Sequence, residues 1–312
     1  PDMVELRNDG PEINLAGMRL TDDPRNPDKY VFPAETMLES AGFLVLYANN
    51  ADGTSGLHLG FKLNKDGGSL YLYDSLNRSG ALLDSMTYGP QLPDLSVGRN
   101  ASGEWVLCQP TLGAHNVPAL VGDPSALRIN EWLAAESAAF DADFVEIYND
   151  SPLPVAMGGM QLTDNAIGMP AKWQVPALTF IPAQGFLVFK ADGDSAAGPR
   201  HLNFRLSADR GEIALLTSNL ALVDLVLYGP QFPDQSFGRT QADARQLAAF
   251  TVPTPGSANV LVIPQPTGSA LVINELLANN ATLANPDGTT PDWVEIYNGL
   301  PSMVNLGGLS LT

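Results

Sequence analysis

The chain has 312 residues, 45% of them hydrophobic, which suits two globular domains with cores of their own and excludes a disordered tail. Its 16 Lys and Arg residues against 34 Asp and Glu residues give a net charge of −18, and such a surface repels the phosphates of nucleic acids. No apolar run approaches the roughly 18 to 20 residues of a membrane helix, and the single cysteine, Cys108, excludes an intrachain disulfide.

Short strands joined by turns are favoured over helices by the 29 glycines and 25 prolines. Alternating apolar residues predict about eight or nine strands per domain. Two stretches look helical, 130–139 and 239–249, and the first is expected to be a strand followed by a loop. In chain order, the expected strands of the best-defined domain are 127–133, 144–148, 155–163, 186–191, 201–206, 212–217, 220–228 and 246–252.

Several short motifs recur in the same order at a nearly constant spacing. The longest runs from Tyr88 through Arg99 and returns from Tyr228 through Arg239. The spacing far exceeds the roughly 20 to 50 residues of solenoid repeats, so it indicates duplication of a whole domain. The other recurring pieces are 2–6 with 143–147 and 292–296, 17–21 with 159–163 and 308–312, 42–45 with 185–188, 58–63 with 201–206, and 127–133 with 271–277.

The repeat sets the predicted domain boundaries. The opening strand at 127–133 has a later counterpart at 271–277 but none before residue 2. We therefore expect the chain to be a window on a longer array or a larger protein. The predicted parts are 1–116, a module lacking its first strand; 117–126, a linker; 127–259, a complete module; 260–270, a proline-rich linker; and 271–312, the start of a third module.

The motifs of this module resemble the lamin-tail domain as it occurs in bacterial secreted and surface proteins. The resemblance rests on residues 129–131, 144–149, 158–164 and 253–259, which recur in part in the other copies. It implies an all-β fold of tandem immunoglobulin-like antiparallel β-sandwiches without catalytic residues. It also implies an extracellular or cell-surface location in bacteria.

A glutamate recurs in the middle of one strand as Glu5, Glu146 and Glu295. It is either an acid or ligand, or a solvent-facing or barely buried carboxylate that bonds a neighbouring loop. General acid–base chemistry needs a second carboxylate or base nearby, and no such partner is evident beside it. We therefore favour the structural role.

Other recurring polar residues are also interpreted as structural. One histidine per module, His58 and His201, is too little for a zinc site. Asparagines tolerate turn conformations and bond turn backbones. That role is expected of Asn130, Asn149, Asn274 and Asn298.

Calcium is the only cofactor with candidate ligands in the sequence. They are Asp192, Asp194 and Asp52, and Asp287 with Asp292 forms a further pair. Calcium takes six to eight oxygens and the loop of an EF-hand is absent, so solvated turns are the favoured alternative. Nucleophile motifs and phosphate loops are also absent, and we expect no enzyme activity in this chain.

The leading functional hypothesis is a non-catalytic structural or adhesive repeat segment of a larger secreted or surface protein, forming a stalk or fibre. The alternative is an accessory calcium- or carbohydrate-binding module of a larger extracellular hydrolase or nuclease. Expected partners are other modules of the same or neighbouring chains, without nucleic acid or membrane insertion. Head-to-tail self-assembly is one such arrangement, in which residues 271–312 supply a strand to residues 1–20 of the next molecule.

Overall fold

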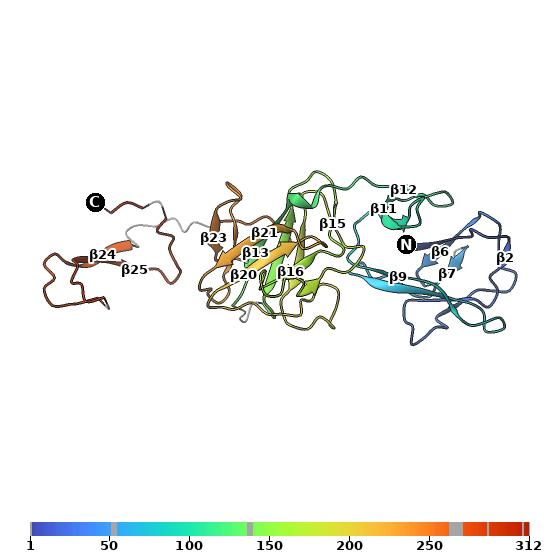
Figure 1. Ribbon diagram of the computed structural model, residues 1–312, viewed down its shortest axis with the longest axis horizontal. Helices are drawn as coiled ribbons and strands as arrows, with labels where there is room; N and C mark the ends of the chain where they lie inside the picture. Colours follow the sequence, from blue (N-terminus) through green and yellow to red (C-terminus); the bar gives the residue numbers. More distant parts are fainter. Residues whose placement is uncertain are drawn as a thin grey trace. The chain divides into compact units, whose positions relative to one another are not determined.

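The computed structural model describes residues 2–50, 55–135, 140–261, 271–285, 287–307 and 309–311. Nearly all of its regular structure is antiparallel β-sheet (Figure 1), which confirms the predicted all-β class. The chain divides into two compact units, Pro1–Val260 and Leu261–Thr312. Among the described residues, no helix is long and apolar enough to cross a membrane.

Residues 127–259, the central segment, form two packed sheets. One has the strand order β19-β14-β13-β22-β23, the other β17-β16-β20-β21, and β15 pairs with β18. The strands are β13 (Leu127–Leu133), β14 (Phe144–Asn149), β15 (Val155–Ala156), β16 (Gln161–Thr163), β17 (Trp173–Gln174), β18 (Phe180–Ile181), β19 (Phe186–Lys190), β20 (Gly211–Leu216), β21 (Leu222–Tyr228), β22 (Ser236–Arg239) and β23 (Leu247–Phe250).

The core of the central segment lies between its two sheets. Trp132 and Ile147 reach it from the first sheet, and Leu162 and Ile213 from the second; all four are fully buried. A bulge shifts the register of β13 against β14 between Ile129 and Glu131. Apolar side chains on the inner faces of both sheets therefore pack into one continuous core, which gives the sandwich that the sequence predicts.

Residues 2–118, the N-terminal segment, carry strands at the matching positions. β1 pairs with β6 as β14 pairs with β19, and β10 pairs with β11 as β22 pairs with β23. The strands are β1 (Asp2–Arg7), β2 (Ile13–Asn14), β3 (Arg19–Thr21), β4 (Tyr30–Val31), β5 (Met37–Leu38), β6 (Phe43–Ala48), β7 (Leu57–His58), β8 (Gly68–Tyr73), β9 (Leu82–Tyr88), β10 (Ser96–Arg99), β11 (Trp105–Gln109) and β12 (Val117–Pro118).

The two segments differ at one position in the first sheet. In the central segment, β13 lies between β14 and β22. In the described part of the N-terminal segment no strand takes that place, so β1 and β10 belong to separate three-stranded sheets, β1-β6-β7 and β10-β11-β12. Leu20, Leu46 and Leu59 nevertheless form a buried core there.

Several expected elements differ from the structure. Residues 201–206 form only an isolated bridge at His201, although Leu202, Phe204 and Leu206 are buried as their alternation predicted. Residues 155–163 contain two short strands, β15 and β16. The predicted linker 117–126 includes β12, paired with β11, and a 3-10 helix at Pro124–Ala126.

The second unit contains one hairpin, β24 (Leu271–Leu277) paired with β25 (Trp293–Asn298). Its register shifts between Ile273 and Glu275, which matches the bulge of β13. Every described residue of this hairpin is at least partly exposed. Most of the predicted linker 260–270 lies outside the described residues.

Candidate functional site

Two carboxylates are buried side by side in the central segment. Glu131 of β13 and Glu146 of β14 are cross-strand partners, and neither side chain is exposed to solvent. The expectation of a solvent-facing or barely buried Glu146 is therefore wrong. The second carboxylate, which was not evident from the sequence, is Glu131. It lies in the Ile-Asn-Glu opening, whose later copy places Glu275 opposite Glu295.

Both carboxylates bind the segment that closes the module. The amide of Thr254 donates to Oε1 of Glu131 at 2.9 Å, and its hydroxyl donates to Oε2 at 3.1 Å. The hydroxyl of Ser236 also donates to Glu131. The amide of Gly256 donates to Oε2 of Glu146 at 2.5 Å. The two glutamates thus accept hydrogen bonds from backbone amides that lie more than a hundred residues away in the sequence. The bond to Gly256 is the loop contact expected of Glu146.

Asn130 and Asn259 complete this network. The side-chain amide of Asn130 donates to Glu146 at 2.8 Å and to Asn259 at 3.1 Å, and that of Asn259 returns a bond to the carbonyl of Asn130. The expected turn role of Asn130 is therefore wrong, because the bulge turns its side chain into the protein. Asn149 and Asn298 bond turn backbones as predicted.

Burial controls the protonation of the pair. It raises the pKa of Glu146 to about 7, although bonds from Gly256 and Asn130 oppose it and the charge of Glu131 adds to it. Burial also raises the pKa of Glu131, against bonds from Ser236 and Thr254. The site can take up a proton near neutral pH. Because neither group reaches solvent, it offers no surface to a substrate.

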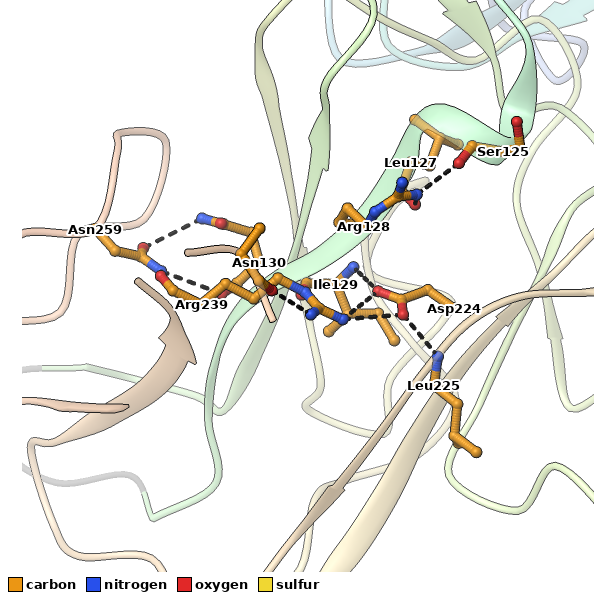
Figure 2. A network of polar contacts seen from close by, with 10 residues as sticks. Ser125, Leu127, Arg128, Ile129, Asn130, Asp224, Leu225, Arg239 and Asn259 are labelled. Carbon is orange, nitrogen blue, oxygen red and sulfur yellow. Dashed lines mark hydrogen bonds and ion pairs between the residues drawn. The ribbon is translucent and has the colours of Figure 1, made fainter. Parts of the chain in front are cut away.

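A second polar contact fixes the bulge of β13 (Figure 2). Arg239 donates to both carboxylate oxygens of Asp224, at 2.9 and 2.8 Å. Asp224 accepts the amide of Ile129 at 2.8 Å, and Nε of Arg239 donates to the Ile129 carbonyl at 2.9 Å. The ion pair therefore bonds both backbone groups of Ile129, which lies outside the paired register of β13 and β22.

The matching ion pair of the N-terminal segment provides a control for this interaction. Asp84 and Arg99 are 53% and 45% exposed, against 14% for each of Asp224 and Arg239. We predict that Asp224→Ala lowers the free energy of unfolding of the central segment by about 2–3 kcal/mol, because it leaves the mostly buried charge of Arg239 without its carboxylate and the amide of Ile129 without an acceptor. Asp84→Ala should cost under about 1 kcal/mol. Urea unfolding measures both, and equal losses contradict the assignment.

Of the calcium candidates, Asp192 and Asp194 lie in a hydrogen-bonded turn. Partial burial raises the pKa of Asp192, but bonds from the Asp194 amide and from His201 outweigh it, so the pKa lies below its ordinary value. Nδ1 of His201 is 2.6 Å from Asp192, and Asp194 accepts the amide of Ala196 at 3.2 Å. Asp52 lies outside the described residues. Among those described, no group of three or more His, Cys, Asp or Glu residues is placed to hold a metal ion.

The N-terminal and central segments contact each other through the loop after β9. The amide of Gly89 donates to the carbonyl of Ala177 at 2.9 Å, and Nε2 of Gln91 donates to the carbonyl of Leu178 at 3.2 Å. A Cβ atom added at Gly89 would lie 1.9 Å from Oγ1 of Thr179. The Tyr-Gly-Pro-Gln motif predicts a fixed turn here, because proline presets φ and glycine permits a tight bend. The structure contains this turn, in which Nε2 of Gln91 donates to the carbonyl of Gly89. Its role as a junction was not predicted.

An ion pair supports the same junction. Nη2 of Arg200 lies 2.8 Å from Oδ1 of Asp66, and both side chains are about one-third exposed. Pro199 packs so close to Gly67 that a Cβ there would approach it to 2.9 Å. The two segments therefore meet through backbone bonds, an ion pair and close packing, rather than through a flexible tether alone.

Two packed antiparallel sheets closed by a buried polar network define an immunoglobulin-like β-sandwich module. In agreement, the family model of the lamin tail domain matches residues 122–230, from just before β13 through β21. No curated protein and no solved structure matches the chain. The family match supports the resemblance for the central segment.

Proposed function

We infer that the N-terminal and central segments are copies of one non-catalytic module, and that their function is to hold neighbouring parts of a larger bacterial extracellular or cell-surface protein in a fixed arrangement. The junction carries this proposal. The backbone amide of Gly89 and the side chain of Gln91 join the two segments by hydrogen bonds that a simple linker would not need. Such junctions suit a stalk or an adhesive array.

The internal chemistry supports a structural role. The most polar buried site, Glu131 with Glu146, uses its oxygens to bond the closing segment and has no exposed surface. The free thiol of Cys108 is buried, and burial raises its pKa, which keeps it in the less reactive protonated form. These features stabilise the sandwich and leave catalysis to other parts of a larger protein.

A distance measurement across the junction tests the proposal. Spin labels at Leu76 and Ile167, which are 73% and 95% exposed, report on the N-terminal and central segments after Cys108→Ala removes the native thiol. We expect a single narrow distance distribution. Gly89→Val should broaden it, because its side chain collides with Thr179.

The matched control is Gly229→Val. Gly229 occupies the same motif position in the central segment, but a Cβ there meets nothing within 4 Å. The control should leave the distribution narrow. A broad distribution in the protein without either valine would contradict a fixed junction and favour independent accessory modules.

A further inference from the structure

The loop that forms the junction exists a second time with the same conformation. In the first copy, the amide of Gln91 donates to Lys65 at 2.8 Å and its Nε2 donates to Gly89 at 2.8 Å. In the second, Gln231 donates to Ala208 at 2.7 Å and to Gly229 at 2.8 Å. Residues 229–233, the projecting loop of the central segment, are therefore preformed like residues 89–93.

The surface that receives this loop also exists twice. Residues 176–180 receive it in the central segment, and residues 33–37 are their sequence counterparts in the N-terminal segment. Leu178 and Glu35 both have a left-handed backbone, with φ of 54° and 62°. The threonine hydroxyl that follows donates to a proline carbonyl in both loops, from Thr179 to Pro176 at 2.7 Å and from Thr36 to Pro33 at 2.9 Å. The receiving loop 33–37 is thus preformed as well.

Within the described part of the chain, only one loop of each kind is occupied: residues 89–93 contact residues 176–180. Gly89 is in contact with Thr179, whereas Gly229 has no neighbour that would exclude a side chain. Its φ is not in the left-handed range either, so neither local space nor the backbone requires glycine at 229. A glycine there is explained if another surface approaches as closely as Thr179 approaches Gly89.

The apolar side chains beside the unoccupied loops are exposed. Phe180 is 5% exposed at the junction, but its counterpart Met37 is 47% exposed. Leu92 is half-buried there, and its counterpart Phe232 is 45% exposed. Leu92 and Phe180 line the same hollow at the junction. Phe232 and Met37 would meet in the corresponding hollow if the two free loops came together.

We propose that the chain self-associates head to tail. Residues 229–233 of one copy dock on residues 33–37 of a second copy, and the contact repeats the geometry of the junction within the chain. A second copy is the occupant that the structure supplies, because its residues 33–37 present the receiving loop in the required conformation. The proposal extends the proposed function, which is to hold neighbouring modules in a fixed arrangement, and it rests on the junction described above.

The charges indicate how strong this contact is. The Asp66–Arg200 ion pair has no counterpart, because Asp209 and Leu57 occupy the matching positions. The contact therefore depends on Phe232 and Met37. Each copy also carries a charge of −18, so the copies repel each other. We therefore expect weak association, with a dissociation constant on the order of 100 μM, that strengthens as salt screens the repulsion.

Sedimentation velocity of the whole chain from about 10 μM to 1 mM tests the proposal. We expect dimers and longer oligomers as concentration and salt rise. Phe232→Asp and Met37→Asp should each weaken association at least about tenfold. Ile167→Asp is the matched control, because it adds the same charge at a 95% exposed apolar position outside both loops, and it should associate like the wild type.

Mixing the two variants identifies the geometry. Phe232→Asp retains the receiving loop and Met37→Asp retains the projecting loop, so the mixture should form dimers that do not grow further. Near-UV circular dichroism confirms that each variant is folded, and Phe232→Ser with Met37→Ser replaces any that is not. A mixture that stays monomeric while the wild type associates would overturn the head-to-tail contact.

Two further outcomes would also overturn the proposal. One is a wild-type chain that stays monomeric at every concentration while the spin labels still show a narrow distance distribution. The fixed arrangement of the two segments would then stand without self-association. The other is loss of association in Ile273→Asp, a substitution in β24, with none in Phe232→Asp. That result would assign assembly to strand exchange by residues 271–312.

Discussion

Trp132→Ala is expected to lower the free energy of unfolding of the central segment by about 3–5 kcal/mol, the largest effect of any single substitution considered for this chain. Trp132 is fully buried between the sheets, with its ring 5.9 Å from that of Tyr228 and 6.4 Å from that of Phe237. Its removal leaves a cavity in a close-packed core. Urea unfolding followed by far-UV circular dichroism measures the loss.

Trp132→Phe separates packing from hydrogen bonding. Among the residues that the structure describes, the buried Nε1 of Trp132 has no hydrogen-bond partner, so phenylalanine loses only part of the packing. We expect less than half the loss of the alanine variant. Trp105→Ala, in the N-terminal segment, is the control and should leave the central segment unchanged. A loss below about 1 kcal/mol for Trp132→Ala would contradict the described core.

The second large effect is a pH dependence that originates from Glu146. Burial raises the pKa of Glu146 in the folded state to about 7 from the ordinary value of 4.5. The folded protein therefore binds this proton more tightly than the unfolded chain. The stabilisation from Glu146 is fully present below pH 4.5 and is lost as the pH rises through about 7. The difference amounts to about 3 kcal/mol.

Glu146→Gln tests this dependence by keeping the side chain neutral. Between pH 5 and pH 8, the wild type should lose about 2–3 kcal/mol more unfolding free energy than the variant. Glu5→Gln is the control at the matching position, where the carboxylate accepts the amide of Gly113 at 2.6 Å but is not fully buried. Parallel pH profiles for the wild type and Glu146→Gln would show that Glu146 is ionised in the fold throughout this range.

Local sequence patterns account well for the strands and less well for their surroundings. Alternation and turn residues predict β14, β19, β20 and β21 closely, because each strand carries its own signal. Residues 201–206 alternate in the same way but pair only at His201. Their apolar side chains fill the core without a ladder of hydrogen bonds, and periodicity cannot distinguish these two cases.

The buried glutamates show a limit of a different kind. Alternation in β14 suggests one polar face, but β14 lies inside a five-stranded sheet, and the segment around Thr254 and Gly256 bonds the two carboxylates. That segment is more than a hundred residues away in the sequence. The recurring Ile-Asn-Glu opening, beside the recurring mid-strand glutamate, was the available signal that two carboxylates belong together.

The junction was hidden for a related reason. The Tyr-Gly-Pro-Gln motif is identical at residues 88–91 and 228–231, and both copies form the same turn. The close approach of Thr179 to Gly89 marks the occupied copy, whereas a Cβ at Gly229 would meet nothing within 4 Å. Contacts between domains leave little trace in a single sequence, because one surface residue can serve a turn and an interface together.

The width of the distance distribution between labels at Leu76 and Ile167 tests the central claim most directly, at concentrations too low for self-association. A fixed junction predicts one narrow distribution that Gly89→Val broadens and Gly229→Val does not. A distribution that is broad from the start, and equally broad in both variants, would contradict the claim that these sandwiches are held in a fixed arrangement.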